Sequence, residues 1–200
     1  MSFKDLQLNK PLLRAIAESG YDNPTLVQEK TIPLVLDKKD VITSAQTGTG
    51  KTAAFALPIL QLLFDYQDAP KKGKKIKALV VSPTRELAIQ IGENFKNYGK
   101  YTNLRSTVIY GGTSIEPQKD ILKKGIDILI ATPGRLLDLH KQDFVNLDYI
   151  QILVLDEADL MLDMGFIDDV KKIERLCPET KQTLLFSATI PYKVEQLANT

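Results

Sequence analysis

An eight-residue stretch, residues 45–52, constrains the fold of this chain more than any other part of the sequence. It reads Ala-Gln-Thr-Gly-Thr-Gly-Lys-Thr between two apolar segments, which is the order of strand, loop and helix that a phosphate-binding loop requires. Gly48 and Gly50 can adopt positive φ angles, so several backbone N–H groups can approach one anion. Lys51 can then reach the β and γ phosphates, while the Thr52 hydroxyl can hold Mg²⁺. The predicted nucleotide-binding residues of the loop are Gln46, Thr47, Gly48, Thr49, Gly50, Lys51 and Thr52.

The first position of this loop departs from the usual pattern. Such loops begin with glycine, but Ala45 occupies that position here. On this stretch alone, an ordinary glycine-rich turn therefore remains an alternative, and the decision depends on the rest of the chain.

Six short apolar or β-branched runs indicate strands. Stretches long enough for a crossover separate them, and most of these show helical periodicity. The runs are apolar almost throughout, as expected of parallel strands that are covered on both faces. We therefore predict an α/β fold, a doubly wound, mostly parallel sheet flanked by helices on both faces. The predicted strands are residues 41–44, 78–81, 107–110, 128–131, 152–155 and 183–186.

The residues before the first strand predict two helices. Apolar positions within residues 3–19, with Pro11 near the start and Gly20 after the end, indicate a short helix. A second helix is expected to begin at residues 23–25. Taken alone, the connection between them, followed by Gln28, reads as an ordinary turn with a solvated glutamine. We divide the chain into residues 1–35 and a phosphate-loop core of residues 36–200, within a single domain of residues 1–200.

Polar segments follow directly after all six runs. In a parallel sheet these segments share the carboxyl edge, where open α/β domains bind ligands. Asp156 and Glu157 follow the fifth run. We predict that Asp156 holds Mg²⁺ through water and that Glu157 orients and deprotonates the attacking water, so that Lys51, Asp156 and Glu157 are the catalytic residues. An acidic surface turn is the alternative.

Composition excludes some classes of protein and leaves others open. The net charge of +1, from 26 basic and 25 acidic residues, argues neither for nor against nucleic acid. A single cysteine, Cys177, and a single histidine, His140, cannot form an internal disulfide or a structural zinc site. The longest apolar stretch, residues 53–64, contains Pro58 and is too short to span a membrane. We expect a soluble, cytoplasmic protein without membrane contact.

Residues 69–77 form the strongest basic run of the chain. They include five lysines, a proline and a glycine. A solvated surface loop is the favoured interpretation, and contact with phosphates is the alternative.

The sequence from Asp156 to Asp159, Asp-Glu-Ala-Asp, spells the signature of the DEAD-box RNA helicases, and other segments resemble motifs of that family in the same order. Residues 45–52 resemble its motif I, which normally begins with alanine, so the departure at Ala45 disappears. Residues 83–88 resemble motif Ia, Gly111 and Gly112 the double-glycine motif, residues 132–135 motif Ib and residues 187–189 motif III. The Q motif is matched by Gly20, Tyr21, Pro24, Thr25 and Gln28, and its upstream aromatic residue by Phe3.

The resemblance implies a RecA-like fold and ATP with Mg²⁺ as cofactors. It implies that Gln28 pairs with the adenine edge and that Phe3 and Tyr21 pack near the ring, with Thr25 part of the same site. It also implies that Asp159, Ser187 and Thr189 couple the nucleotide site to RNA-dependent closure. The residues expected to hold the RNA backbone, largely without reading its sequence, are Pro83, Thr84, Arg85, Gly111, Gly112, Thr132, Pro133, Gly134 and Arg135.

The resemblance further implies a second, similar helicase domain that lies outside these 200 residues and supplies arginines to the ATP site. Residues 193–198 read as a helix with no stop signal before Thr200, so we expect a longer full-length protein. The 200 residues are expected to be the monomeric N-terminal domain of an ATP-dependent RNA helicase, which binds nucleotide but does not unwind RNA alone. Two alternatives remain open. One is an ATP-gated RNA clamp or scaffold, and the other, less favoured, is a DNA-dependent P-loop ATPase.

Overall fold

Six parallel strands form one sheet in the computed structural model of the chain, which describes residues 1–46, 48–65 and 75–198. Their order is β1-β6-β5-β2-β4-β3. The predicted doubly wound sheet is therefore confirmed, and all of its strand pairs are parallel. Each predicted strand is present, with β3 displaced by one residue and β6 longer by one residue at each end. The strands are β1 (Val41–Ser44), β2 (Ala78–Val81), β3 (Ser106–Ile109), β4 (Ile128–Ala131), β5 (Ile152–Leu155) and β6 (Gln182–Ser187).

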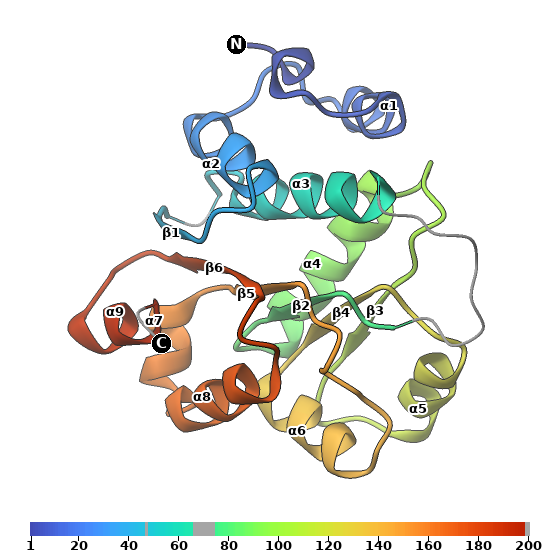
Figure 1. The fold of residues 1–200 in the computed structure, drawn as a ribbon, viewed down its shortest axis with the longest axis vertical. Helices are drawn as coiled ribbons and strands as arrows, with labels where there is room; N and C mark the ends of the chain where they lie inside the picture. The colour runs from blue at the N-terminus through green and yellow to red at the C-terminus, as the bar shows by residue number, and fades with distance from the viewer. Residues whose placement is uncertain (47, 66–74, 199–200) are drawn as a thin grey trace.

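Helices cover both faces of the sheet (Figure 1). The first face carries the 3-10 helix η1 (Phe3–Leu6) and helices α1 (Lys10–Glu18), α2 (Leu26–Leu36), α3 (Lys51–Asp65) and α4 (Arg85–Tyr98). The second face carries α5 (Glu116–Lys123), α6 (Pro133–Lys141), α7 (Ala158–Asp163), α8 (Ile167–Leu176) and α9 (Tyr192–Ala198). No helix in the described ranges is long and apolar enough to cross a membrane.

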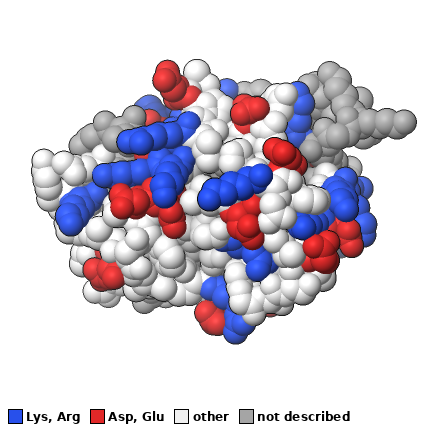
Figure 2. All heavy atoms as spheres, turned by 90° about the horizontal axis from the view of Figure 1, so that it is seen from below, with Lys and Arg blue, Asp and Glu red and all other residues white. Residues whose placement is uncertain are grey.

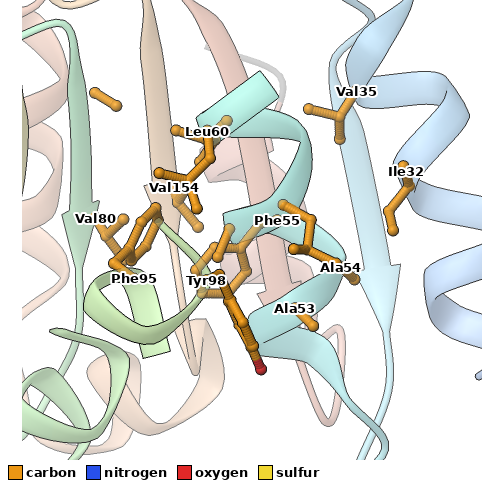
Figure 3. Packing of buried hydrophobic residues seen from close by; sticks show 14 of the residues in the cluster. Ile32, Val35, Ala53, Ala54, Phe55, Leu60, Val80, Phe95, Tyr98 and Val154 are labelled. Carbon is orange, nitrogen blue, oxygen red and sulfur yellow. The ribbon is translucent and has the colours of Figure 1, made fainter. Parts of the chain in front are cut away.

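Alternate residues of the central strands enter two separate hydrophobic cores. Val80 and Val154 pack with α3 and α4 on the first face, where Phe55 and Phe95 are among the largest buried side chains (Figure 3). Leu153 and the residues level with it on the next two strands, Leu79 and Leu129, point to the second face. Since successive side chains of a strand point to opposite faces, burial on both faces requires an unbroken apolar run. This explains why the strands could be recognised from composition alone.

The N-terminal segment differs from the single helix expected over residues 3–19. It forms η1 and then, after Gln7 in a left-handed conformation (φ 57°), the separate helix α1. The Asn9 side chain accepts a hydrogen bond from Leu12 N (3.1 Å) and so caps a new helix. Pro11 near its start lacks an N–H and cannot continue a helix from the preceding turn. The break therefore follows from the cap and the proline together.

Charged side chains are distributed without a dominant sign on the face seen in Figure 2, where acidic side chains lie beside the basic ones. This distribution agrees with the net charge of +1. Recognition of a polyanion by this protein must therefore rest on local groups rather than on the charge of the whole molecule.

Candidate functional site

The carboxyl ends of the strands form a continuous rim, because hydrogen bonds carry the strand pairing one residue beyond the strands. Ala45 N donates to Ser187 O (3.0 Å), Ser82 N to Ala131 O (3.0 Å), and Asp156 N to Val81 O (3.0 Å). The polar segments that follow the strands consequently begin at neighbouring positions on one edge of the sheet. This is the arrangement that the sequence analysis predicted.

The loop between β1 and α3 has the backbone geometry of a phosphate cradle. Gly48 and Gly50 have φ angles of +82° and +88°, a region that residues with a Cβ atom rarely adopt. The Thr49 hydroxyl donates to Gln46 O (2.7 Å), which closes the turn, and α3 begins directly at Lys51. The first N–H groups of α3 have no partners within the helix and lie at the positive end of its dipole. Thr47, also predicted as a binding residue, lies outside the described residues.

Gln28 lies against this loop and is only 4% exposed. Its Oε1 accepts a hydrogen bond from Thr25 N (3.0 Å), and its Nε2 donates to Gly50 O (3.1 Å). The first contact belongs to the capping box that starts α2. Sequence reasoning on Gln28 alone favoured a solvated side chain, which is wrong. Its contact with adenine stays a prediction.

Lys51 and Glu157 form a buried ion pair. Lys51 Nζ lies 2.6 Å from Glu157 Oε1, and the two side chains are 6% and 9% exposed. Glu157 has φ 52° and ψ 52°, a left-handed conformation that disfavours a residue other than glycine by about 1 kcal/mol. This turn after β5 directs Glu157 towards the phosphate loop, and the contact with Lys51 compensates for part of the strain.

Asp156 is buried beside that pair with one oxygen unsatisfied. The residue is 5% exposed, and its Oδ1 has no hydrogen-bond partner among the described residues. Burial raises the pKa of Asp156 to about 7, although Lys51 lowers it; the neighbouring Glu157 raises it further. A buried carboxylate oxygen without a partner fits a hard cation such as Mg²⁺, which prefers oxygen ligands. Thr52, in the first turn of α3, supplies a hydroxyl of the same chemistry.

The described residues alone offer too few ligands to enclose a metal ion. No group of three or more His, Cys, Asp or Glu residues suited to a metal occurs in the part of the chain that the structure describes. Mg²⁺ characteristically keeps several waters and binds through one or two carboxylates together with substrate phosphates. The residues at this site therefore fit Mg²⁺ that arrives with a nucleotide.

Replacing Asp156 by asparagine is expected to stabilise the chain, and the stabilisation should increase as the pH rises. The measurement is made in EDTA and without nucleotide. The pKa of Asp156 lies near 7 in the folded chain against an ordinary value of 3.8. The folded state therefore binds this proton more tightly than the unfolded state, and stability is lost between about pH 4 and pH 7. The variant lacks this loss and should gain about 4 kcal/mol in free energy of unfolding at pH 8 relative to pH 4.

Urea unfolding across this pH range, followed by circular dichroism, measures the gain. The exposed Asp120→Asn is the matched control and should show no comparable trend. A constant difference between Asp156→Asn and the unmodified chain at every pH would contradict the buried charge.

The structure brings Asp159, Ser187 and Thr189 together, while their role in coupling stays a prediction. Thr189 N and Thr189 Oγ1 each donate to Asp159 Oδ2 (2.9 Å), and Asp159 N donates to Ser187 Oγ (3.0 Å). Burial is the largest single influence and raises the pKa of Asp159, but hydrogen bonds from Thr189 and Ser187 outweigh it, and the net shift is downward. The segment after β6 is thus bonded to the start of α7.

The segments after β2, β3 and β4 lie farther along the same rim. Thr84 caps α4 by accepting from Leu87 N (3.2 Å), and α6 begins at Pro133. Two helix N-termini, which favour phosphate groups, therefore lie at the rim. Arg135 Nη2 donates to Thr113 O (3.0 Å) and connects the last two segments. Among the predicted RNA contacts, Arg85, Gly111, Gly112 and Gly134 are exposed, Thr84, Thr132 and Arg135 are half-buried, and Pro83 and Pro133 are buried.

Comparison with known sequences decides the family. The profile of the DEAD/DEAH box helicase family matches residues 25–197. The chain belongs to the DEAD/DEAH box helicase family. It is 47% identical over 198 residues to the DEAD-box ATP-dependent RNA helicase RhpA of Helicobacter pylori, covering 99% of this chain and 39% of that protein. It is 49% identical over 197 residues to the ATP-dependent RNA helicase CshA of Limosilactobacillus reuteri, covering 98% of this chain and 38% of that protein.

Solved structures of the family share the fold. A DEAD box protein from Methanococcus jannaschii superimposes with a TM-score of 0.92 at 42% identity, covering all of this chain and 53% of that one. A hypothetical ATP-dependent RNA helicase from Sulfolobus tokodaii gives 0.87 at 43% identity, covering 96% of this chain and 54% of that one. The predicted RecA-like fold is confirmed. The chain spans about two fifths of the curated relatives described above.

Gln118 shapes this DEAD-box domain in a way that sequence reasoning missed. It lies on α5 and is 8% exposed. Its Oε1 accepts from Tyr110 N (3.1 Å), and its Nε2 donates to Tyr110 O and Ser114 O (3.2 Å each). One amide thereby fixes both ends of the loop that contains Gly111 and Gly112. A lone glutamine on an amphipathic helix carries no local signal of such a role.

Proposed function

We propose that this chain is the ATP-binding N-terminal domain of an ATP-dependent RNA helicase that couples ATP binding and hydrolysis to local unwinding or remodelling of RNA. The observation that carries the proposal is the buried contact between Lys51 and Glu157 across 106 residues. It joins a phosphate loop to the acidic motif that hydrolysis of a nucleotide requires. The names of the relatives, ATP-dependent RNA helicases, agree with this assignment.

The phosphates of ATP bind to the N–H groups of the loop and of the first turn of α3. A bound γ phosphate draws Lys51 away from Glu157, because the phosphate offers the ammonium group more negative charge. Glu157 is then free to orient the attacking water and to accept its proton. Asp156 and Thr52 would hold Mg²⁺, which would supply positive charge to neutralise the charge that develops on the phosphates. Lys51 thus pairs with Glu157 when no nucleotide is bound and with the phosphates when ATP is bound.

RNA lies along the rim beyond the nucleotide. The N-termini of α4 and α6 and the side chains of Arg85 and Arg135 contact its phosphates, which binds the backbone without reading bases. Exposed glycines at positions 111 and 112 allow the backbone to approach closely. The link between Asp159 and Thr189 transmits nucleotide state to RNA-dependent closure.

The partner that completes the site is a second helicase domain of the full-length protein. Arginines supplied from outside accelerate related phosphoryl transfers by about 10³-fold to 10⁵-fold. The 200 residues alone therefore bind nucleotide as a monomer but hydrolyse it very slowly and do not unwind RNA. That the protein works in the cytoplasm stays a prediction from the sequence.

Isothermal titration calorimetry of the chain with Mg²⁺ and either ADP or GDP tests the proposal. We expect ADP to bind at least about 10-fold more tightly, because a paired amide discriminates bases by about 1–3 kcal/mol. Gln28→Ala should bring the ratio of the two affinities close to one. The ratio is the informative quantity, since Gln28 also supports the loop. Equal affinities for the unmodified chain would contradict adenine selection, and the absence of binding to either nucleotide would contradict the proposed function.

A further inference from the structure

Tyr21 is held at a defined position just beyond the end of α1. Gly20 adopts φ +76°, Gly20 N donates to Ala17 O (3.1 Å) and Tyr21 N donates to Ile16 O (3.3 Å). These two bonds form a Schellman motif, which fixes the direction of the chain as it leaves a helix. The Tyr21 side chain remains 45% exposed. Its backbone is therefore fixed while its ring is available to a ligand.

The segment that follows Tyr21 lies against the phosphate loop. Gln28 Nε2 bonds to Gly50 O at 3.1 Å. A Cβ atom added to Gly50 would lie 3.2 Å from Thr25 Oγ1, which shows how closely this segment approaches the loop. When the phosphates of a nucleotide occupy the loop, its sugar and base are therefore long enough to reach the segment that contains Tyr21.

Tyr98, the last residue of α4, packs against the Tyr21 ring. It is 3% exposed, the two ring centroids are 6.3 Å apart at 57°, and the Tyr98 hydroxyl approaches the Tyr21 hydroxyl at 3.5 Å. Figure 3 shows the Tyr98 ring against the hydrophobic core, with its oxygen pointing away from Phe95 and Leu60 and towards the Ala53 end of α3. That end of α3 is the end that follows the phosphate loop.

A second set of contacts fastens α1 to the same region just beyond α4. The Tyr101 hydroxyl donates to both carboxylate oxygens of Glu18 (2.8 and 2.7 Å), and Lys100 Nζ lies 2.5 Å from Glu18 Oε2. The Arg14 guanidinium lies over the Tyr101 ring at 4.1 Å. These contacts tie the helix that leads into Tyr21 to the residues directly after α4.

We propose that Tyr98 is a positioning residue that holds the Tyr21 ring against the base of a bound nucleotide. The inference rests on the proposed function and deepens it, because it assigns base recognition partly to α4, outside the motifs that resemble the family. Tyr98 acts through Tyr21 and does not touch the phosphates. Its loss therefore weakens binding of a nucleotide but leaves binding of a bare polyphosphate unchanged.

Calorimetric titration with ADP and with inorganic tripolyphosphate, each with Mg²⁺, separates the two contributions. Tyr98→Phe removes only a long hydroxyl contact and should weaken ADP about 2-fold to 3-fold. Tyr98→Leu removes the supporting ring and should weaken ADP about 10-fold. Tripolyphosphate affinity should change less than about 2-fold in both variants. Circular dichroism and urea unfolding check that each variant is folded under the conditions of the titration. If Tyr98→Leu does not fold, Tyr98→Phe, which retains the core packing, carries the test.

Two further variants make the test specific. Tyr21→Ala should weaken ADP at least as much as Tyr98→Leu, and combining the two should add nothing, because one residue acts through the other. Tyr149→Phe, an exposed tyrosine before β5, should leave both affinities unchanged. Additive losses, an equal loss of tripolyphosphate affinity, or unchanged ADP affinity in Tyr98→Leu would each overturn the inference while the proposed function stands. An unmodified chain that binds neither ligand would overturn both.

Discussion

Replacing Lys51 by methionine is expected to lower the free energy of unfolding by about 3 kcal/mol, because it leaves the Glu157 carboxylate buried without a cation. The two side chains are 6% and 9% exposed, so water cannot substitute for the lost partner. The same change removes the ammonium group that we propose contacts the β and γ phosphates. We therefore also expect ADP affinity to fall by at least about 100-fold. Urea unfolding and calorimetry measure the two effects.

A double-mutant cycle isolates the ion pair from the rest of the site. Glu157→Leu alone should destabilise the chain by a similar amount, because it leaves Lys51 charged and buried. The double variant should be destabilised by at least about 2 kcal/mol less than the sum of the two single effects. Lys172→Met is the matched control, because Lys172 pairs with Asp169 but is 63% exposed, and such pairs contribute at most about 1 kcal/mol. A cost at Lys51 no larger than at Lys172 would contradict the buried pair.

The two glycines of the phosphate loop are expected to respond differently to alanine. Both have positive φ angles, so each substitution strains the backbone by about 1–2 kcal/mol. At Gly48 nothing lies within 4 Å of an added Cβ atom, whereas at Gly50 that atom would lie 2.4 Å from Gln28 Nε2. Gly50→Ala must therefore also displace a buried amide and break its bond to the loop.

We expect Gly48→Ala to lower the free energy of unfolding by about 1 kcal/mol and Gly50→Ala by about 3 kcal/mol. ADP affinity should fall at least about 100-fold in Gly50→Ala, because the loop and Gln28 can no longer occupy their places together. Thermal and urea unfolding with calorimetric ADP titration of the two variants measure the difference. Equal stability losses would show that backbone strain alone, and not the contact with Gln28, decides the requirement for glycine.

The rim was predictable because its elements are encoded locally. Apolar runs buried on both faces identified the strands. Asp156 and Glu157 were identified because they follow the apolar run of β5 directly. Contacts between distant segments were not predictable in this way. Lys51 and Glu157 meet across 106 residues, and the Tyr98 and Tyr21 hydroxyls across 77. No periodicity or local motif encodes such a meeting, since it depends on how α3 and α4 pack against the sheet.

The order of the strands in the sheet also could not be predicted from the sequence. The central strands have nearly interchangeable apolar sequences, so any two could pair with similar hydrogen bonds. The selection of β1-β6-β5-β2-β4-β3 depends on which helices fill which face. This choice places Ser187 beside Ala45 and brings Asp159 to Thr189.

By itself, the sequence determined the phosphate loop with its glycines, the positions of the six strands, the acidic pair at the end of β5 and the motifs along one edge. These are properties of short segments, set by backbone freedom, alternation of burial and residue chemistry. Only the tertiary structure decided that Lys51 pairs with Glu157, that Gln28 donates to Gly50 O, and that Tyr98 packs against Tyr21. Those contacts join distant segments, and their free energy exists only after the hydrophobic cores on both faces of the sheet have formed.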